Sequence, residues 1–394
     1  MSAFDAIVVG AGVIGAGTAF ALARSGFRVA LLDTGPVGSA PGETGGTSRA
    51  SFAWINATAK TDREDYHRLN AAGVEHYRSL AREFGEARLG LHPTGMIAWA
   101  NPDDDDRRRA LRGQVERLRE WNSPVTSLDE SGLRTLEPHV TFARGAEGFL
   151  AYGDAWLDAP RAIDLFCERI RAEGGTVHFG AQGRVDALLR DDAGAVRGVR
   201  AGSRRLAAPV VVAALGPDTE NTLRAWLGPG ELGNRPFLDR RPGLLVDIPD
   251  TGSFRLVRHV LYTGDNAFHM RPEPAGGIRI GSEDADPPQG EAPDDRKARV
   301  LALLARARAL IPAIGGDVPL DTLARECTAR VGVRPVPADD RTIIGPVGGA
   351  PGLYVIVTHS GVTLGPWLGE LATEEIASGA MPPELAPFRF DRFA

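Results

Sequence analysis

Two short, continuously apolar runs lie near the start of the chain. Residues 6–9 read Ala-Ile-Val-Val and residues 29–32 read Val-Ala-Leu-Leu. Runs of this length without polar alternation are typical of strands buried on both faces of a parallel sheet. Residues 16–24 have a helical composition, and Gly26 is placed to end that helix. The first 33 residues are therefore predicted to form a strand, a helix and a second strand.

A glycine motif lies where the first strand passes into the helix. Gly10, Gly12 and Gly15 form a G-x-G-x-x-G pattern, and the second strand ends at Asp33. The first glycine permits a tight turn, the second lets the backbone approach a pyrophosphate, and the third lets the helix pack close to the strand. Asp33 can accept hydrogen bonds from ribose hydroxyls and disfavours the 2′-phosphate of NADP. This unit predicts a dinucleotide site and leaves NAD and FAD open.

The remaining chain alternates between two kinds of pattern. Residues 210–213 and 353–357 are again continuously apolar, whereas residues 242–282 alternate and indicate antiparallel strands with a turn at 273–277. Amphipathic helices are predicted over residues 62–84, 158–173 and 294–311, and a helix after residue 361 is expected to end near Gly379. Shorter strands are expected at residues 95–99, 176–179, 185–189 and 267–271. Residues 35–51 are interpreted as a loop rich in Gly, Ser and Thr.

The order of these elements predicts two domains in an α/β fold. Strands of the parallel type occur at both ends and in the middle, with antiparallel strands between them, which favours a discontinuous Rossmann-like domain interrupted by an α+β domain on an antiparallel sheet. The dinucleotide domain is predicted to comprise residues 1–90, 145–235 and 325–394. The substrate domain is predicted to comprise residues 91–144 and 236–324.

Composition removes several other classes of function. The 394 residues carry a net charge of −6 and no basic stripe, so no nucleic-acid partner is expected. No apolar run reaches the roughly 18 residues of a membrane helix. Cys167 and Cys327 form no CxxC and are interpreted as reduced packing residues of a cytoplasmic protein. No metal site is predicted.

Five segments, in order along the chain, resemble the D-amino acid oxidase superfamily of FAD-dependent oxidoreductases, which includes glycine oxidase, sarcosine oxidase and D-amino acid dehydrogenases. The first is the glycine motif with its acid, and the second is the loop 47–51, placed where that family crosses the flavin. The third is residues 152–158. The fourth is residues 331–339, which contain a Gly-x-Arg-Pro turn. The fifth is residues 358–366, which resemble the C-terminal flavin-binding turn.

The resemblance implies bound FAD and oxidation of a C–N bond. Hydride would pass from the C–H next to nitrogen to flavin N5, the imine product would hydrolyse, and O2 or another acceptor would re-oxidise the cofactor. Gly332 stands where some sarcosine oxidases attach flavin to Cys, and Cys327 lies too early, so non-covalent FAD is predicted. Neither turn contains the Lys that activates oxygen in sarcosine oxidase. The residues implied to contact FAD are Gly10, Gly12, Val13, Ile14, Gly15, Asp33, Thr47, Ser48, Arg49, Val185, Gly216, His359, Ser360, Gly361, Val362 and Thr363.

Four residues are candidates for the catalytic site. Arg334 could bind a substrate carboxylate through its guanidinium, or could structure its turn and pair with Asp339. Arg49 could lie near the flavin ring, or could contact phosphate or its own loop. His269 shares one strand face with Arg271, and that face could line the pocket or meet solvent. Tyr262 is a candidate with the same two alternatives as His269.

The C-terminal turn offers an electrostatic role. The helix that follows it would direct its N-terminus at the reduced flavin, which carries negative charge near N1 and O2, and Ser360 could also act as an ordinary N-cap.

Three alternatives to a simple amine or amino-acid oxidase or dehydrogenase remain open. The first is a tailoring enzyme for a bulky or carrier-bound amine, in which Arg334 need not bind a carboxylate. The second is a non-catalytic flavoprotein subunit, or one that depends on a partner. The third is an NAD-dependent dehydrogenase, which rests on the glycine motif alone. Substrate, electron acceptor and oligomeric state are left open.

Overall fold

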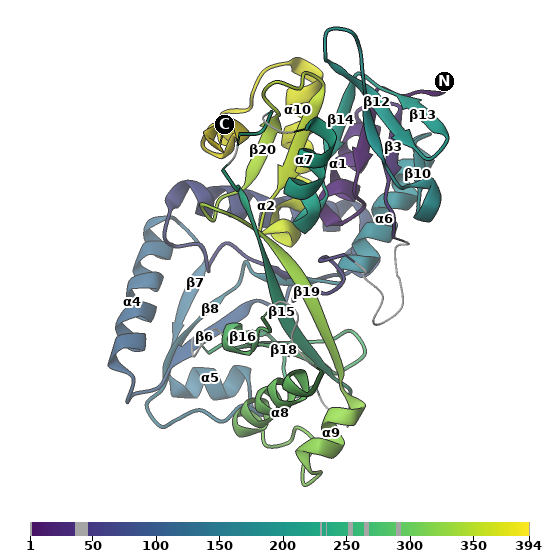
Figure 1. Cartoon of the computed structure of the whole chain (residues 1–394). Helices are drawn as coiled ribbons and strands as arrows, with labels where there is room; N and C mark the ends of the chain where they lie inside the picture. Colours follow the sequence, from purple (N-terminus) through teal and green to yellow (C-terminus); the bar gives the residue numbers. More distant parts are fainter. Residues whose placement is uncertain are drawn as a thin grey trace.

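The computed structural model describes residues 2–35, 46–228, 231–233, 235–250, 255–263, 268–288 and 293–393. Residues 36–45 of the predicted Gly-rich loop and Ala267 of the predicted strand 267–271 lie outside these ranges. Figure 1 shows two halves, one above the other, with both chain termini in the upper half.

The apolar runs predicted as buried strands meet in one six-stranded sheet in the upper half. Its strand order is β10-β3-β2-β14-β21-β20, and every neighbouring pair is parallel except β20 with β21. In parallel strands all the carboxyl ends lie at one edge, where ligands of such sheets bind. The strands are β2 (Ala6–Val9), β3 (Val29–Leu32), β10 (Thr176–His178), β14 (Val210–Ala213), β20 (Ile343–Pro346) and β21 (Leu353–Val357).

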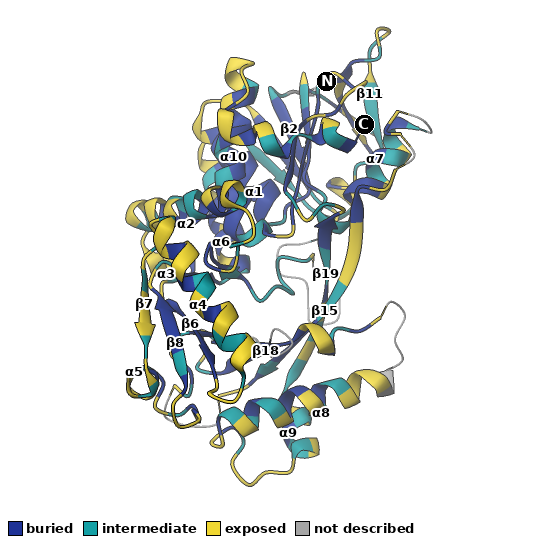
Figure 2. Cartoon of the chain, turned by 90° about the vertical axis from the view of Figure 1, so that its left-hand side faces the viewer, coloured by how far each residue is buried: buried dark blue, intermediate teal, exposed yellow. Residues whose placement is uncertain are grey.

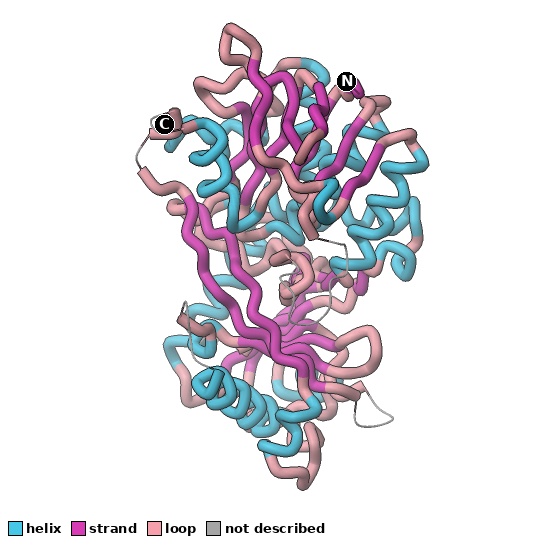
Figure 3. The backbone as a smooth tube through the Cα atoms, turned by 45° about the vertical axis from the view of Figure 1, so that its right-hand side comes forward, coloured by secondary structure: helices cyan, strands magenta, loops and turns pink. Residues whose placement is uncertain are grey.

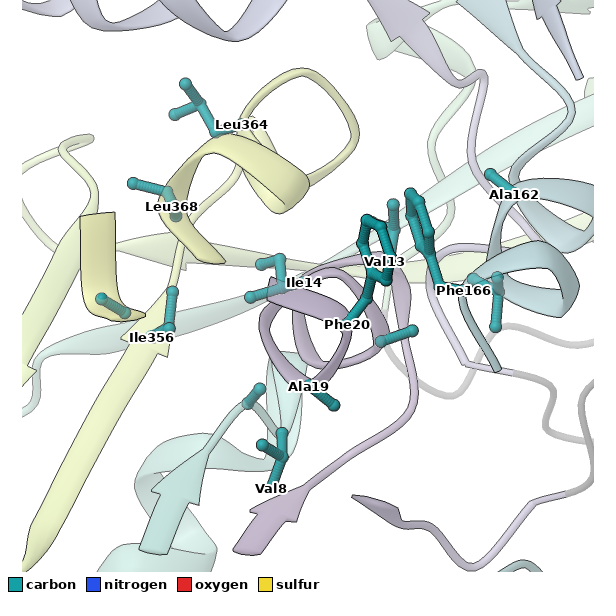
Figure 4. Packing of buried hydrophobic residues seen from close by; sticks show 14 of the residues in the cluster. Val8, Val13, Ile14, Ala19, Phe20, Ala162, Phe166, Ile356, Leu364 and Leu368 are labelled. Carbon is teal, nitrogen blue, oxygen red and sulfur yellow. The ribbon is translucent and has the colours of Figure 1, made fainter. Parts of the chain in front are cut away.

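Helices pack closely on one face of this sheet. Helix α1 (Val13–Arg24) lies against α10 (Gly361–Ser378) and α6 (Ala159–Ala172), and α10 also contacts α2 (Glu64–Phe84). Glycine makes the α1–α10 contact possible, because a Cβ at Gly369 would lie 2.8 Å from the Cα of Thr18. On the other side of α1, the Phe20 ring stacks on Phe166 with a centroid distance of 5.4 Å (Figure 4). This packing fixes the N-termini of α1 and α10 beside each other.

The lower half is built on an eight-stranded, mainly antiparallel sheet of order β19-β15-β18-β17-β16-β6-β8-β7. Its two longest strands, β15 and β19, run up into the other half (Figure 3). Apolar residues of α8 cover one sheet face. The strands are β6 (Met96–Ala100), β7 (Val125–Leu128), β8 (Glu147–Ala151), β15 (Leu238–Ile248), β16 (Val260–Tyr262), β17 (His269–Pro272), β18 (Ile278–Gly281) and β19 (Thr328–Pro337); the helices are α4 (Asp105–Glu120), α5 (Glu130–Leu136), α8 (Pro293–Leu310) and α9 (Leu320–Glu326).

Two small sheets complete the described structure. One has the order β4-β9-β5 and contributes residues to the apolar clusters of both halves. The other has the order β1-β13-β12-β11 and lies on the upper half (Figure 1). Their strands are β1 (Ser2–Ala3), β4 (Trp54–Ile55), β5 (Leu91–His92), β9 (Ala155–Leu157), β11 (Ala187–Arg190), β12 (Val196–Ala201) and β13 (Arg204–Ala207), and the short helices α3 (Glu86–Leu89) and α7 (Thr219–Leu227) connect larger elements. Figure 2 shows buried residues concentrated in the strands and exposed residues on the outer helices.

The predicted fold class is confirmed, with local corrections. The Gly-x-Arg-Pro segment is not a turn but the second half of the ten-residue strand β19. The strand predicted from residue 185 begins at Ala187. Strands β8 and β19 fall in segments assigned to the dinucleotide domain, yet both pair in the eight-stranded sheet. The division into domains stays a prediction.

Three further observations concern the described residues as a whole. Cys167 and Cys327 are free. No group of three or more His, Cys, Asp or Glu is placed to hold a metal ion within the described ranges. No helix there combines the length and the apolar character that crossing a membrane requires.

Candidate FAD and substrate site

The glycine turn after β2 leaves no room for side chains. Gly10 has a φ of +103°, and a Cβ there would lie 2.2 Å from the carbonyl oxygen of Ala214. A Cβ at Gly15 would lie 1.8 Å from the carbonyl oxygen of Gly10. The turn therefore wraps tightly around the end of β14, and the first turn of α1 follows it directly, which is the cradle that a pyrophosphate needs.

The N-terminus of α1 is open to an anion. Its N-cap residue, Gly12, supplies no side-chain cap, and the hydroxyl of Ser48 instead accepts a hydrogen bond from the Val13 N–H at 3.1 Å. A hydroxyl in this position marks where a phosphate oxygen can accept the same N–H groups. Thr47 donates to the carbonyl oxygen of Val333 at 2.5 Å and so ties this loop to β19. In the described structure, Nη1 of Arg49 is buried without a hydrogen-bond partner.

Asp33 braces the glycine turn as well as ending β3. Its Oδ2 accepts from the Ala11 N–H at 2.5 Å and its Oδ1 from the Gly35 N–H at 2.7 Å. Each oxygen keeps a second lone pair, so ribose hydroxyls can still be bound there. Val185 packs partly buried against the apolar cluster that contains Leu32. Together these residues fit the adenosine end of FAD.

Gly216 lies at the same sheet edge. It follows β14 with a φ of +56°, and its carbonyl accepts from the Thr219 hydroxyl at 2.7 Å. The glycine turn, this residue and the turn after β21 therefore converge at the carboxyl ends of three neighbouring strands.

The C-terminal turn presents the N-terminus of α10 to this edge. A Cβ at Gly361 would lie 3.2 Å from Cδ1 of Ile14, so the turn rests on the start of α1. The carbonyl of Val362 accepts from the Tyr77 hydroxyl at 2.8 Å. The Thr363 hydroxyl donates to the Trp54 carbonyl at 3.2 Å. The turn is thus held by α1, α2 and β4 together.

Ser360 does not act as an ordinary N-cap, which corrects one interpretation of the sequence. It makes no side-chain capping bond, and its Oγ accepts from the hydroxyl of Tyr66 on α2 at 2.9 Å. The first N–H groups of α10 therefore have no capping side chain from their own N-cap residue, and the positive end of the helix dipole remains available to a ligand.

His359 lines a crowded but solvent-accessible position beside that helix end. The residue is exposed, yet surrounding protein atoms lower its pKa to about 3 by desolvation, with the charges of Lys60, Arg334 and Arg241 adding to the effect. At neutral pH the imidazole is therefore uncharged.

The segment 47–53 crosses the inner face of the eight-stranded sheet. A Cβ at Gly332 would lie 2.9 Å from the Cβ of Ala50. Arg279 donates to the carbonyl of Ser51 at 2.9 Å, and Arg271 donates to the carbonyl of Phe52 at 2.6 Å. The segment is therefore fastened to β19, β18 and β17 in turn.

A cavity of about 130 Å³ lies beside this segment, and Arg49 and Arg271 line it together with Trp156. Arg271 is only 2% exposed and stacks on Trp156 with its guanidinium 4.3 Å from the ring centroid. Burial lowers the pKa of Arg271 to about 9, so it remains charged at neutral pH. Whether Arg49 contacts the flavin ring or phosphate stays a prediction.

His269 and Tyr262 lie opposite each other on β17 and β16. The His269 ring meets Phe52 edge-on at 4.3 Å, and the Tyr262 ring lies 5.9 Å from Trp54. His269 is partly buried, and Arg271 on the same strand face is covered by Phe52. The alternative that this face meets solvent is therefore wrong. Both candidates therefore lie beside the crossing segment, and their catalytic roles stay predictions.

Arg334 does not pair with Asp339, because Asp339 binds Arg392 at 2.7 Å. Nη2 of Arg334 instead donates to the Pro242 carbonyl at 3.1 Å and pairs with Asp286. It projects from the same strand face as Gly332, the face on which Ala50 rests. The structure thus gives Arg334 a partner, Asp286, that the sequence does not suggest.

Asp154, in the segment 152–158, holds β4, the short strand that contacts the C-terminal turn through Thr363. Its Oδ2 accepts from Nε1 of Trp54 at 2.9 Å and from the Thr58 hydroxyl at 2.6 Å. Complete burial outweighs these bonds and raises its pKa to about 7. Because the pKa in the folded state lies above the unfolded value of 3.8, the folded protein binds a proton that the unfolded chain lacks between those values.

We expect Asp154→Asn to remove a pH dependence of stability. As pH rises through about 4 to about 7, the wild type should lose on the order of 2–4 kcal/mol of unfolding free energy relative to the variant. Urea unfolding of both proteins across this range measures the difference, in which all other titrating groups cancel. Parallel curves would show that Asp154 is already ionised in the folded protein.

Several residues at this site carry no sequence signal of their own. Tyr66, Trp54 and Asp286 come from a helix, a two-residue strand and a loop, and each reaches the site through a contact distant in sequence. Lys60 also lies here, with Nζ 6.0 Å from the Tyr66 ring centroid. Only its rarity, as one of two lysines in the chain, could have drawn attention to it.

The parallel sheet, its glycine turn and the start of α1 define a dinucleotide-binding protein. Residues 5–375 match the model of the family described as FAD dependent oxidoreductase, DAO, and the chain belongs to this family. The dinucleotide is therefore FAD, and the NAD-dependent alternative is wrong. The glycine turn, the open start of α1 and the buried Nη1 of Arg49 fit this cofactor.

Two relatives illustrate the range of the family. The chain is 29% identical over 418 residues to the tRNA 5-methylaminomethyl-2-thiouridine biosynthesis bifunctional protein MnmC of Ralstonia nicotianae; the match covers 96% of this chain but 58% of that protein. It is 25% identical to the glycine oxidase of Geobacillus kaustophilus, covering 99% and 97% of the two chains. The crystal structure of glycine oxidase from that organism superposes with a TM-score of 0.79 over 99% of both chains at 21% identity, which establishes the shared fold.

Proposed function

We propose that this protein oxidises a C–N bond of an amine or amino acid with non-covalently bound FAD. The observation that carries the proposal is the N-terminus of α10, which has no side-chain cap from Ser360 and rests on Ile14 at the start of α1. The charges of Lys60, Arg334 and Arg241 also act on His359 beside it. The resemblance to glycine oxidase supports a small amine or amino acid as substrate. Gly332, where a flavin-bearing Cys could stand, supports non-covalent binding.

Bound FAD supplies an acceptor for the hydride that leaves the carbon next to nitrogen. The protein contributes position and charge. The N-terminus of α10 and the basic groups near it stabilise negative charge that develops beside them. The Ser360 hydroxyl accepts from Tyr66 and makes no cap at the start of α10. Phe52 and Trp54 provide apolar walls beside His269 and Tyr262, which reduces access of water.

An anaerobic reduction experiment tests the proposal. The purified yellow protein is mixed without oxygen with D-amino acids, glycine, sarcosine and larger N-substituted amines, and the visible flavin absorption is recorded. Bleaching by one of them is the expected result, and air is then readmitted. Fast recovery of colour identifies an oxidase and slow recovery a dehydrogenase. Protein that retains no FAD after gentle purification, or FAD that none of these amines reduces, contradicts the proposal.

A second candidate is the same chemistry on a bulky or carrier-bound amine. The pairing of Arg334 with Asp286 favours it, because an arginine that already has a carboxylate partner does not require one from the substrate. Large N-substituted amines in the reduction experiment distinguish this candidate from a simple amino-acid oxidase.

A further inference from the structure

The guanidinium of Arg334 has few free donors. Nη2 carries two hydrogens, and the Pro242 carbonyl and the Asp286 carboxylate accept both. Nε is buried without a partner in the described structure and lies over the backbone of Gly243, where a Cβ would be 3.2 Å away. A carboxylate bound at two points needs two adjacent N–H donors on one edge of the guanidinium. One edge is formed by Nε and Nη2 and the other by Nη1 and Nη2, so both need Nη2. Only Nη1 remains for a ligand while Asp286 stays in place.

Asp286 is held in this position by the sheet itself. Its Oδ1 accepts from the Leu244 N–H at 2.9 Å, just beyond the point where β18 stops pairing with β15 at Leu245. The carboxylate thus continues the ladder where the strand ends. Pro287 follows directly, which restricts the backbone of Asp286 to the extended region that it adopts, with φ −65° and ψ 132°. Asp286 is 17% exposed and Arg334 is 31% exposed.

We propose that Asp286 is a resident counter-ion that occupies the anion-binding side of Arg334 and makes the site select against amines with a free carboxylate next to the reacting carbon. A substrate carboxylate would have to displace Asp286 to gain a two-point contact. Amines whose acid group is absent, esterified or amidated meet no such competitor. The substrate preference rests on the proposed function, whereas the occupancy of Arg334 does not.

The electrostatics of the pair combine the cost of burying Asp286 with its attraction to Arg334. Burial raises the pKa of Asp286 despite the nearby Arg334, and the charge of Glu283 adds to this rise. The cost of burial therefore offsets part of what the contacts with Arg334 and the Leu244 N–H contribute.

Acetate binding to the FAD-loaded protein tests the proposal without turnover. Calorimetric titration with acetate should give a dissociation constant about 10- to 100-fold lower for Asp286→Ala than for the wild type, since charge-assisted hydrogen bonds to Arg334 become available. Acetamide, which lacks the charge, should show no such gain. Acetate should also raise the Tm of the variant more than that of the wild type.

Two further variants make the result decisive. Glu283→Ala removes a charge from the same segment without touching Arg334 and should change acetate binding less than about 3-fold. Asp286→Asn keeps the size of the side chain, replaces Asp286→Ala if that variant does not fold, and should also bind acetate more tightly. Equal acetate affinity in the wild type and in the Asp286 variants, or an equal gain in Glu283→Ala, overturns the proposal. If no amine reduces the flavin but the acetate result holds, only the proposed function fails.

Discussion

Gly15→Ala is expected to yield a protein without FAD. The new Cβ would lie 1.8 Å from the carbonyl oxygen of Gly10 and 2.9 Å from its carbonyl carbon, so backbone atoms on one side must move. Those atoms form the turn that receives the pyrophosphate, and α1 cannot retreat because Gly365 and Gly369 of α10 pack against its other face. Overpacking against backbone should lower the free energy of unfolding by about 3 kcal/mol or more.

A glycine in another helix gives the matched control. Gly113 lies within α4, and a Cβ there would meet only the end of the Arg117 side chain at 3.6 Å. Gly113→Ala should keep its FAD and gain about 0.5–1 kcal/mol, because alanine favours the helix. The ratio of flavin to protein absorbance and urea unfolding measure both effects. Wild-type FAD content and stability in Gly15→Ala would show that the turn tolerates a side chain.

The dinucleotide unit could be predicted because its parts are neighbours in the chain. Two buried strands, a helix and Asp33 lie within 33 residues, and the close approaches at Gly10 and Gly15 arise within that unit and at the end of one adjacent strand. The geometry of this unit can therefore be predicted from the local sequence pattern. The turn that the family resemblance implied within residues 331–339 is instead part of a strand. As the edge strand of its sheet, β19 needs no N–H from Pro335 on its outer side, so the strand tolerates proline.

Partners distant in sequence could not be predicted. Ser360 reads as a helix cap, but Tyr66, 294 positions away, binds its hydroxyl. Arg334 reads as a partner of nearby Asp339, but the register of β15 and the end of β18 bring Asp286 to it instead. Residue type specifies which bonds a side chain can make, whereas strand register decides which of them forms. The roles of residues in the substrate site depend almost entirely on strand register.

Arg271 also has a partner distant in sequence, the carbonyl of Phe52. Among the side chains of this site, we expect its replacement to have the largest effect on stability. Its Nε bonds to the Phe52 carbonyl at 2.6 Å, and its Nη1 lies 2.9 Å from the Pro272 carbonyl and 2.7 Å from Oε1 of Glu273. Arg271→Met keeps much of the side-chain length but leaves these three acceptors without their donor. One of them is the Glu273 carboxylate, which keeps Arg279 at 3.3 Å. Removing one partner of a buried ion pair costs about 3–5 kcal/mol.

The same change should loosen the flavin site, because Arg271 fastens the segment that leads to Trp54. We therefore expect Arg271→Met to lose both unfolding free energy and FAD, and the double variant with Glu273→Gln to recover part of the stability by removing the uncompensated charge. Arg88→Met is the control, since its pair with Glu168 is exposed on the surface and should contribute less than about 1 kcal/mol. Equal unfolding free energies for the Arg271 and Arg88 variants would mean that Arg271 is exchangeable and that the crossing segment is held by its other contacts.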